Sequence, residues 1–500
     1  MEETKAGDMN HLSERLLADD GDSGTQQVVE SAITGEIIVD PLQAGLGLRG
    51  ENQTAQYRDR PFAVGFLVQL VVVFFLAVFW GLGSLKQEET INADTDPDTD
   101  TLSLWGFFFL LFLVSTSSIG IAATSLDFMT SHVEHLMQAA LMISCVILGS
   151  VVVLLFVNDS PGLGFCVLFV LICTGLYAYS VQRRIPFASA NLRTALSAIQ
   201  MNYGVCMLAY AVAAVANLWV VVWLLAFLGV AFRSSTCADG SCEMHMNPVA
   251  FILLLLSYFW TSQVLQNVIH VTVSGVIGTW WFAPQEARSA FSPAIMDSFS
   301  RATTYSLGSI CFGSLLVAII QTLEQIVHSI RQQQQNNLIL CILECLLHFL
   351  QRIGQYFNKW SFCYVGLYGY DYLTAGKKAL ELFQSRGWST IISDDLVQRM
   401  LLLVCLVVGA LTGLVGMFLG SLSGWADPVL GEDPHATVFL ISYVIGFSLA
   451  FILMGVVMSG VDSVIVCFAE APGEFETHHP ALFRNMVEAW RQVYPQECGF

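Results

Sequence analysis

The sequence contains few charged residues, and most of those are acidic. Charged side chains make up 12% of the 500 residues, compared with about 25% in an average soluble domain, and 55% of the residues are hydrophobic. This composition excludes an ordinary soluble protein and indicates a chain that crosses a membrane several times. The formal net charge of −19, from 40 acidic and 21 basic residues, also makes nucleic acid an unexpected partner.

Common motifs of catalysis and metal binding are also missing. The sequence has no G-x-x-x-x-G-K-[ST] phosphate loop and no H-E-x-x-H zinc motif, and "GSLSG" at 420–424 lacks the central serine of a nucleophile elbow. Cys341 and Cys345 lie beside Glu344 and His348, but their spacing does not suit a tetrahedral zinc site. We therefore expect no catalytic residues, no metal and no cofactor.

The two ends of the chain differ from the apolar remainder. Residues 1–61 lack the basic-then-apolar pattern of a signal peptide and are rich in Gly, Asp, Gln and Glu, which is typical of a disordered segment. We expect three regions: a disordered cytosolic tail at 1–61, a transmembrane domain at 62–470 and a cytosolic tail at 471–500.

Apolar runs of about 20 residues, the length that crosses a bilayer, recur throughout the predicted transmembrane domain. The candidate spans are 62–84, 104–124, 136–157, 162–181, 203–231, 249–270, 306–328, 400–421 and 437–460. Two weaker stretches follow a different pattern. The first, 337–357, is amphipathic and suits the membrane interface, whereas 361–374 is short and rich in Tyr and Gly, which suits a broken or re-entrant segment.

Basic residues in short loops set the orientation. They place "QRR" near 183 and "AGKKALELFQSR" near 377 in the cytosol, and the acidic loops 86–103 and 422–436 outside. Both termini are then cytosolic if one of the two weaker stretches crosses, and the sequence leaves open which one. The predicted fold is an all-α polytopic transmembrane helical bundle of about ten spans with broken or re-entrant segments.

Two of the 13 cysteines lie close together in a short polar loop, "RSSTCADGSCEMH". Asp and Gly between Cys237 and Cys242 can turn the chain back on itself, and the loop is predicted to face outside. A disulfide between these cysteines is therefore one of two open possibilities, the other being two free thiols.

The segment "QVLQNVIHVTVSGVIGTWWFAP", residues 263–284, is unusually polar for a membrane helix. On a continuous helix, one stripe contains Trp260, Gln263, Asn267, His270 and Ser274, with Gln266 beside it. Unpaired polar groups cost several kcal/mol each in hydrocarbon, so the stripe must face other helices or a water-filled cavity. Hydrogen bonding between helices is one interpretation. The whole stripe, followed by a predicted helix break at Gly275 and Gly278, favours a transport pathway.

Aromatic side chains follow the stripe. Trp280 and Trp281 are either part of an interfacial aromatic belt or the faces that hold an organic cation. Tyr364 and Tyr368 supply further aromatic faces near a possible helix break, although packing is an alternative role for them.

Four long segments resemble the choline transporter-like family, in the order that the family has them. They are "YFWTSQVLQNVIHVTVSGVIGTWWF", "SFSRATTYSLGSICFGSLLVAI", "NKWSFCYVGLYGYDYLTAGKKALELFQSRGW" and "VDSVIVCFAEAPGEFETHHPALFRNMVEAW". The resemblance covers about residues 60 to 490 and is strongest to fungal, plant and protist members. It implies a multi-pass protein of the plasma membrane, or alternatively of an organelle, with cytosolic termini. Its expected activity is transport of choline or a related quaternary amine.

Together, the stripe and the resemblance predict a substrate site. The candidate substrate-binding residues are Trp260, Gln263, Asn267, His270, Trp280, Trp281, Tyr364 and Tyr368. Aromatic walls suit a loosely hydrated trimethylammonium group, the hydroxyl of choline can bond to Asn267 or Gln263, and His270 is a candidate for proton coupling. A channel-like facilitative pore for other organic cations is the alternative function. The expected partners are the organic cation and the lipid bilayer, and we make no prediction of the oligomeric state.

Overall fold

The computed structural model describes most of the chain. The described residues are 55–81, 100–158, 161–234, 236–238, 241–243, 247–333, 338–385, 396–423 and 434–493. Most of the predicted N-terminal tail lies outside them. Within the described residues the fold is helical apart from one short hairpin, which confirms the predicted fold class.

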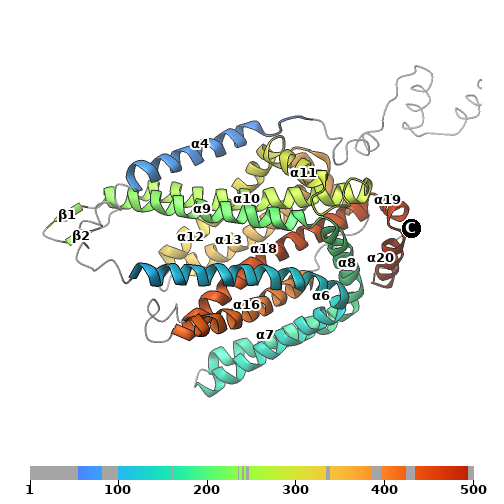
Figure 1. Ribbon diagram of the computed structural model, residues 1–500, viewed down its shortest axis with the longest axis horizontal. Helices are drawn as coiled ribbons and strands as arrows, with labels where there is room; N and C mark the ends of the chain where they lie inside the picture. The colour runs from blue at the N-terminus through green and yellow to red at the C-terminus, as the bar shows by residue number, and fades with distance from the viewer. Residues whose placement is uncertain are drawn as a thin grey trace, which may run out of the picture.

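Long helices form the bundle seen in Figure 1. They are α4 (Arg60–Leu76, continued by a wider turn at Ala77–Gly81), α6 (Asp100–Val157), α7 (Pro161–Val181), α9 (Gly204–Ser234), α10 (Pro248–Phe282), α12 (Leu307–Gln333), α13 (Leu338–Tyr368), α16 (Leu396–Ser423) and α18 (Pro434–Glu470). Shorter helices lie around one end of the bundle. They are α8 (Ile185–Met201, after a 3₁₀ turn at Gln182–Arg184), α11 (Pro293–Thr303), α14 (Tyr372–Ser385), α19 (Pro472–His478) and α20 (Pro480–Val493).

Eight helices of the described chain are long and apolar enough to cross a membrane. One of them, Gly106–Val157, has 52 residues and would be about 78 Å long if straight, more than twice the hydrocarbon thickness of a bilayer. The backbone of this helix is not helical at His132, where φ is −126° and ψ is 25°, and the chain turns back there (Figure 1). Counting this segment as two crossings and adding the more polar α13 gives ten crossings, in agreement with the prediction.

The two weaker stretches of the sequence belong to one helix. α13 covers nearly all of 337–357 and most of 361–374, so the choice between them does not arise. The break predicted within 361–374 lies at the end of α13. Gly369 there has a φ of 67°, a left-handed conformation that glycine adopts without strain. α14 begins three residues later, at Tyr372.

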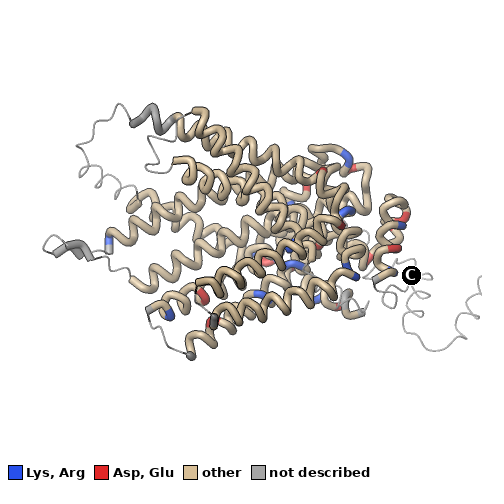
Figure 2. Tube along the Cα trace, turned by 90° about the horizontal axis from the view of Figure 1, so that it is seen from below, with Lys and Arg blue, Asp and Glu red and all other residues tan. Residues whose placement is uncertain are grey.

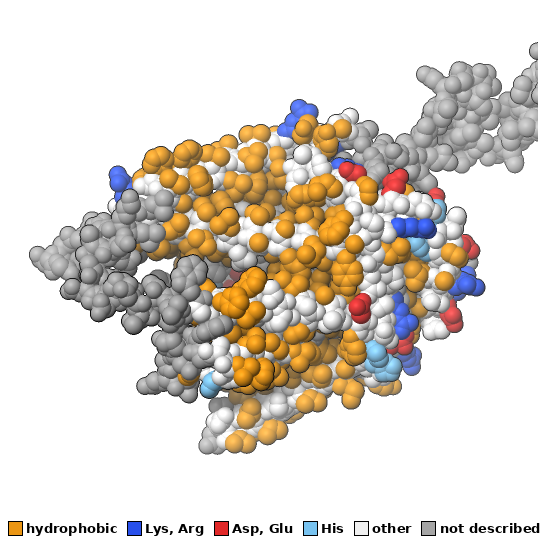
Figure 3. Space-filling view, viewed as in Figure 1, with side chains coloured by type: hydrophobic (Ala, Val, Ile, Leu, Met, Phe, Trp, Pro, Cys, Tyr) orange, Lys and Arg blue, Asp and Glu red, His pale blue; other side chains and the backbone are white. Residues whose placement is uncertain are grey.

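Charged residues are concentrated at one end of the bundle (Figure 2). This end carries α8, α19 and α20, and it contains the basic residues Arg183, Arg193 and Arg484. Figure 3 shows a broad hydrophobic surface over the remaining length of the helices. By the positive-inside rule we expect the charged end to face the cytosol, and we call it the cytosolic end.

The opposite end carries a small hairpin. Strands β1 (Thr236–Ala238) and β2 (Ser241–Glu243) pair antiparallel, and the register sets the backbone of Cys237 directly opposite that of Cys242. Directly opposed positions of an antiparallel pair have Cα atoms about 4.5–5.5 Å apart, a separation that a disulfide can join.

Helix α10 lies in the core of the bundle. Every residue from Val271 to Trp281 is buried, so neighbouring helices enclose this part of α10 on all sides. The predicted break at Gly275 and Gly278 is wrong, because α10 runs as one helix to Phe282. These glycines instead allow close packing: a Cβ atom on Gly275 would lie 2.7 Å from Oγ of Ser298.

Candidate functional site

Three helices, α10, α13 and α18, meet at His270. The Nδ1 atom of its ring lies 2.9 Å from Oγ of Ser459 on α18, and Nε2 lies 3.2 Å from the carbonyl oxygen of Lys359 on α13. A carbonyl oxygen only accepts hydrogen bonds, so Nε2 carries a hydrogen and donates it. Both ring nitrogens are therefore bonded across helix interfaces.

An ion pair between a buried carboxylate and a partly exposed lysine lies beside this histidine. The ammonium Nζ of Lys359 is 2.6 Å from Oδ1 of Asp462 on α18, and it also lies 4.8 Å from the centre of the Trp360 ring. Asp462 is only 3% exposed, and among the described residues it is the one acidic or basic residue classed as buried. A carboxylate removed from water needs a positive partner, because its desolvation costs several kcal/mol.

Small polar side chains extend the junction towards the cytosolic end. The hydroxyl of Ser463 on α18 lies 2.9 Å from that of Ser274 on α10, and Sγ of Cys363 on α13 lies 3.5 Å from Nε2 of His270. A Cβ atom on Gly366 would lie 2.6 Å from the carbonyl oxygen of Val271, the residue after His270, so α13 and α10 approach closely next to the histidine. We call the contacts among His270, Lys359, Cys363, Asp462 and Ser459 the three-helix junction.

Aromatic side chains of α13 lead from the junction to the cytosolic end. Trp360, Tyr364 and Tyr368 are spaced four residues apart and therefore share one face of the helix. The rings of Tyr364 and Tyr368 are 5.3 Å apart, and the ring of Tyr370 lies 5.6 Å beyond that of Tyr368.

Two carboxylates of α18 lie opposite this aromatic face. Asp462 and Glu470 are eight residues apart, which places them on the same side of α18. Asp462 pairs with Lys359 at one end, and the hydroxyl of Tyr368 donates a hydrogen bond to Glu470 at the other. Because α13 and α18 run in the same direction, the aromatic residues and the carboxylates face each other in register.

The outer part of the predicted stripe contacts a different helix, α12. Nδ2 of Asn267 donates to Oγ of Ser314 at 2.9 Å, Nε2 of Gln263 donates to Oε1 of Gln321 at 3.4 Å, and the indole of Trp260 donates to the Cys311 carbonyl at 3.0 Å. The stripe thus makes hydrogen bonds between helices on two sides of α10. Whether these side chains also meet a substrate stays a prediction.

Trp280 and Trp281 lie at the cytosolic end and are fully buried. The ring of Trp280 stacks on His479 with centres 4.1 Å apart, and that of Trp281 stacks on Phe475 at 4.0 Å. Trp280 comes ten residues after His270, a rise of about 15 Å along the helix. The structure therefore does not bring the tryptophans to the three-helix junction, and their contact with a cation stays a prediction.

Lys359, Trp360, Asp462 and Glu470 were not among the predicted site residues. Asp462 has a clear signal, since it lies in a stretch of α18 with no other charged residue before Glu470, where an ionisable residue indicates function. Lys359 lies between the two weaker stretches, where the sequence gives no reason to expect an internal cation. Its role follows from the union of these stretches into α13.

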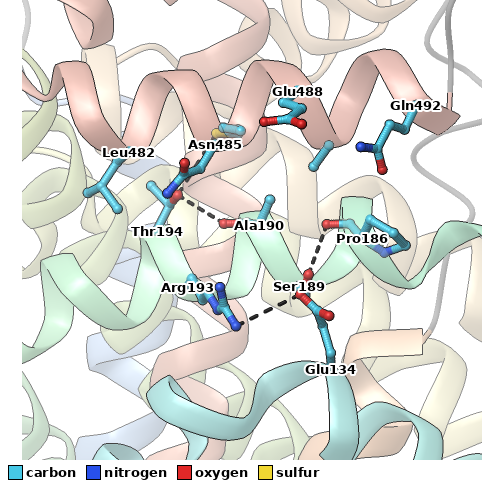
Figure 4. Close-up of a pocket in the computed structure, with 12 residues that line it drawn as sticks. Glu134, Pro186, Ser189, Ala190, Arg193, Thr194, Leu482, Asn485, Glu488 and Gln492 are labelled. Carbon is cyan, nitrogen blue, oxygen red and sulfur yellow. Dashed lines mark hydrogen bonds and ion pairs between the residues drawn. The ribbon is translucent and has the colours of Figure 1, made fainter.

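The pocket drawn in Figure 4 lies elsewhere. It is a groove of about 210 Å³ between α8 and α20, with Arg193 and Thr194 on one side and Asn485 and Glu488 on the other. None of the predicted site residues lines it. The groove belongs to the cytosolic surface and is separate from the three-helix junction.

Comparison with known proteins finds relatives in several fungi. Protein PNS1 of Gibberella zeae is 31% identical over 331 residues, which cover 63% of this chain and 59% of that protein. Protein PNS1 of Cryptococcus neoformans is 27% identical over 403 residues, covering 78% and 72%, and that of Debaryomyces hansenii is 26% identical over 461 residues, covering 88% of each. The chain therefore spans about three-fifths of the length of the Gibberella protein.

A family model described as plasma-membrane choline transporter matches residues 164–473. This range includes the three-helix junction and the aromatic face of α13. Because the match covers more than half of the chain, the protein is a multi-pass membrane protein that belongs to the plasma-membrane choline transporter family.

Proposed function

We propose that this protein transports choline or a related quaternary ammonium cation, and that the cation passes between α13 and α18. One observation carries the proposal: an aromatic face of α13 lies opposite two carboxylates of α18, Asp462 and Glu470. Family membership supports the class of substrate, and the geometry supports the path.

Asp462 is the proposed counter-ion of the substrate. A quaternary ammonium group cannot donate a hydrogen bond, so it is best held by a negative charge together with aromatic faces. The ammonium of Lys359 already occupies such a place, between the carboxylate of Asp462 and the ring of Trp360. Lys359 thus acts as an internal cation that the substrate displaces when it binds.

Tyr364 and Tyr368 form the proposed route between this site and the cytosol. Their rings extend the aromatic face of Trp360, and Glu470 supplies a second negative charge at the mouth. His270 holds α10 against both walls of the route through its two ring nitrogens. The predicted contacts of the substrate with Trp260, Gln263 and Asn267, which bond to α12, and with Trp280 and Trp281 lie outside this path and stay a separate proposal from the sequence.

Uptake of radiolabelled choline into liposomes reconstituted with the full chain tests this function. We expect saturable uptake that unlabelled choline and tetramethylammonium inhibit and that 3,3-dimethyl-1-butanol, a neutral molecule of the same shape, does not. Imposing a proton gradient shows whether transport is coupled to protons. Uptake that rises linearly with concentration would favour a channel-like pore, and no uptake above that of empty liposomes would contradict the proposal.

A further inference from the structure

A second pocket lies where α4 begins, at the cytosolic end of the bundle and close to α11 (Figure 1). It has a volume of about 390 Å³ and lies between the start of α4 and the turn that joins α11 to α12. Two arginines, Arg58 and Arg60, line it together with Tyr57, Ala63 and Thr304. No acidic residue is among those that line it in the described chain.

Hydrogen bonds hold the backbone of this pocket in place. The amide of Arg58 donates to the carbonyl oxygen of Tyr305 at 3.1 Å. The carboxylate of Asp59 accepts from Ser309 of α12 at 2.7 Å and from the amide of Tyr372 at the start of α14 at 3.2 Å. The acidic side chain nearest in sequence is therefore engaged by other helices.

The two guanidinium groups have no negative partner within the described residues. No ion pair there includes either arginine, and Nε of Arg58, although shielded from solvent, has no hydrogen-bond acceptor among those residues. The guanidinium of Arg60 lies 5.7 Å from the centre of the Tyr57 ring, a contact that leaves its donors available. A guanidinium fork matches the oxygens of a phosphate group, to which it can donate two hydrogen bonds.

The position of the pocket indicates where such a phosphate comes from. Directly after the arginines, α4 presents apolar side chains to the membrane: Val64 is 59% exposed and Val68 is 56% exposed. The pocket therefore lies at the boundary between the hydrocarbon and the cytosolic headgroups, where anionic lipids are found. An acyl chain can lie along Val64 and Val68 while the headgroup reaches the arginines.

We propose that this pocket binds an anionic phospholipid of the cytosolic leaflet, with Arg58 and Arg60 on its phosphate and its acyl chains along α4. The bound lipid would neutralise two positive charges that the described chain leaves unpaired. It would also stabilise the contacts of Asp59 with α12 and α14. Tyr372 continues these contacts inward, since its hydroxyl donates to Asn358, the neighbour of Lys359.

Thermal stability of the purified full chain in detergent tests the proposal and needs no transport measurement. Phosphatidic acid is the probe, because its phosphate is not shielded by a positive headgroup, and phosphatidylcholine is the zwitterionic comparison. We expect phosphatidic acid to raise the Tm by several degrees more than phosphatidylcholine. In the Arg58→Gln/Arg60→Gln variant, less than half of this difference should remain.

Matched controls separate a site from general attraction to negative charge. Arg183→Gln/Arg484→Gln removes two exposed arginines from the same end of the bundle and should keep the full difference in Tm. Arg60→Gln alone changes an exposed side chain, so it tests the pocket even if the double variant does not fold. Equal protection of the pocket variants and the wild type would overturn the proposal. Protection by inorganic phosphate equal to that by phosphatidic acid would also overturn it, because the site would then bind free phosphate.

Discussion

The ammonium of Lys359 lies 2.6 Å from the carboxylate of Asp462, and the two residues join α13 to α18 inside the bundle. Breaking a buried ion pair by removing one partner costs about 3–5 kcal/mol, whereas removing both partners together is often nearly neutral. Lys359 is partly exposed, which lowers the cost of losing its partner. Comparing the variant that lacks one charge with the variant that lacks both therefore separates the effect of the pair on stability from its proposed role in binding a cation.

Asp462→Asn should lower choline uptake at least tenfold, because an amide has no charge with which to hold a quaternary ammonium group. Uptake of labelled choline by reconstituted protein, measured below saturation, gives the effect. Glu381→Gln, which removes an exposed carboxylate of α14, is the matched control and should keep wild-type uptake.

Stability must be measured beside uptake for this variant. Removing both charges, in Lys359→Gln/Asp462→Asn, should recover most of the stability lost in Asp462→Asn without recovering uptake. Wild-type uptake by either protein that lacks the Asp462 carboxylate would rule out a counter-ion role for that residue.

Lys359→Gln should increase the stabilisation that choline gives. The variant removes the internal cation and leaves Asp462 without its partner, so the protein alone is less stable and the substrate no longer competes for the carboxylate. The rise in Tm at a fixed choline concentration is the measurement, with 3,3-dimethyl-1-butanol as the uncharged control. A rise no larger than that of the wild type would show that Lys359 and Asp462 form a purely structural pair.

Much of the fold follows from the sequence because the membrane imposes strict lengths. Apolar runs of about 20 residues gave nine of the spans, and the loop charges gave their orientation. α13 was harder to predict, because Glu344 and Arg352 make its outer half amphipathic. Only its inner half, residues 360–368, is fully buried in the bundle, and local composition does not reveal this burial.

The candidate site was predicted only in part for a related reason. His270 stands out because an ionisable side chain is costly within a membrane helix, and the structure brings it to the meeting point of three helices. The partner of Asp462 comes from a helix 103 positions earlier in the sequence, so no local pattern identifies the pair. Gly275 and Gly278 show the opposite error, because glycine permits close helix packing as readily as a break.

Gly366→Ala should destabilise the protein by about 1–3 kcal/mol, the usual cost of adding a methyl group to a well-packed interior. The new Cβ atom would lie 2.6 Å from the Val271 carbonyl, and backbone atoms cannot move aside as a flexible side chain can. Gly120→Ala on α6 is the matched control, since nothing lies within 4 Å of its Cβ position. The Tm of Gly366→Ala should be clearly lower than that of Gly120→Ala. Equal values would show that α10 and α13 can move apart without loss of stability.

His479 should make the stability of the cytosolic end depend on pH. Its burial against Trp280 lowers its pKa, the positive charge of Arg288 acts in the same direction, and the hydrogen bond to the Trp280 carbonyl opposes them. The unfolded chain therefore binds a proton more readily than the folded chain. The stability that the neutral His479 contributes is fully present above the pKa of histidine in the unfolded chain, about 6.5. It is lost as the pH falls below that value.

The Tm measured between pH 8 and pH 5 tests this dependence. The wild type should lose stability on acidification, and His479→Gln should lose less of it, because an amide can still donate to the Trp280 carbonyl but does not titrate. His135→Gln changes an exposed histidine and should leave the dependence unchanged. The same acid loss in His479→Gln and in the wild type would assign the titration to another group.

The hairpin of β1 and β2 should be closed by a disulfide between Cys237 and Cys242 on the extracytosolic side. The register sets these two positions directly opposite each other, and the hairpin lies at the end of the bundle opposite α8 and α20 (Figure 1). A membrane-impermeant maleimide should therefore fail to label the loop in intact cells before reduction and should label it after treatment with a reductant.

Cys237→Ser leaves Cys242 without a partner and should be labelled without reduction, which shows that the reagent reaches the loop. Labelling of the unreduced wild type at the level of Cys237→Ser would mean that the two thiols are free, and no labelling of Cys237→Ser would place the hairpin on the cytosolic side.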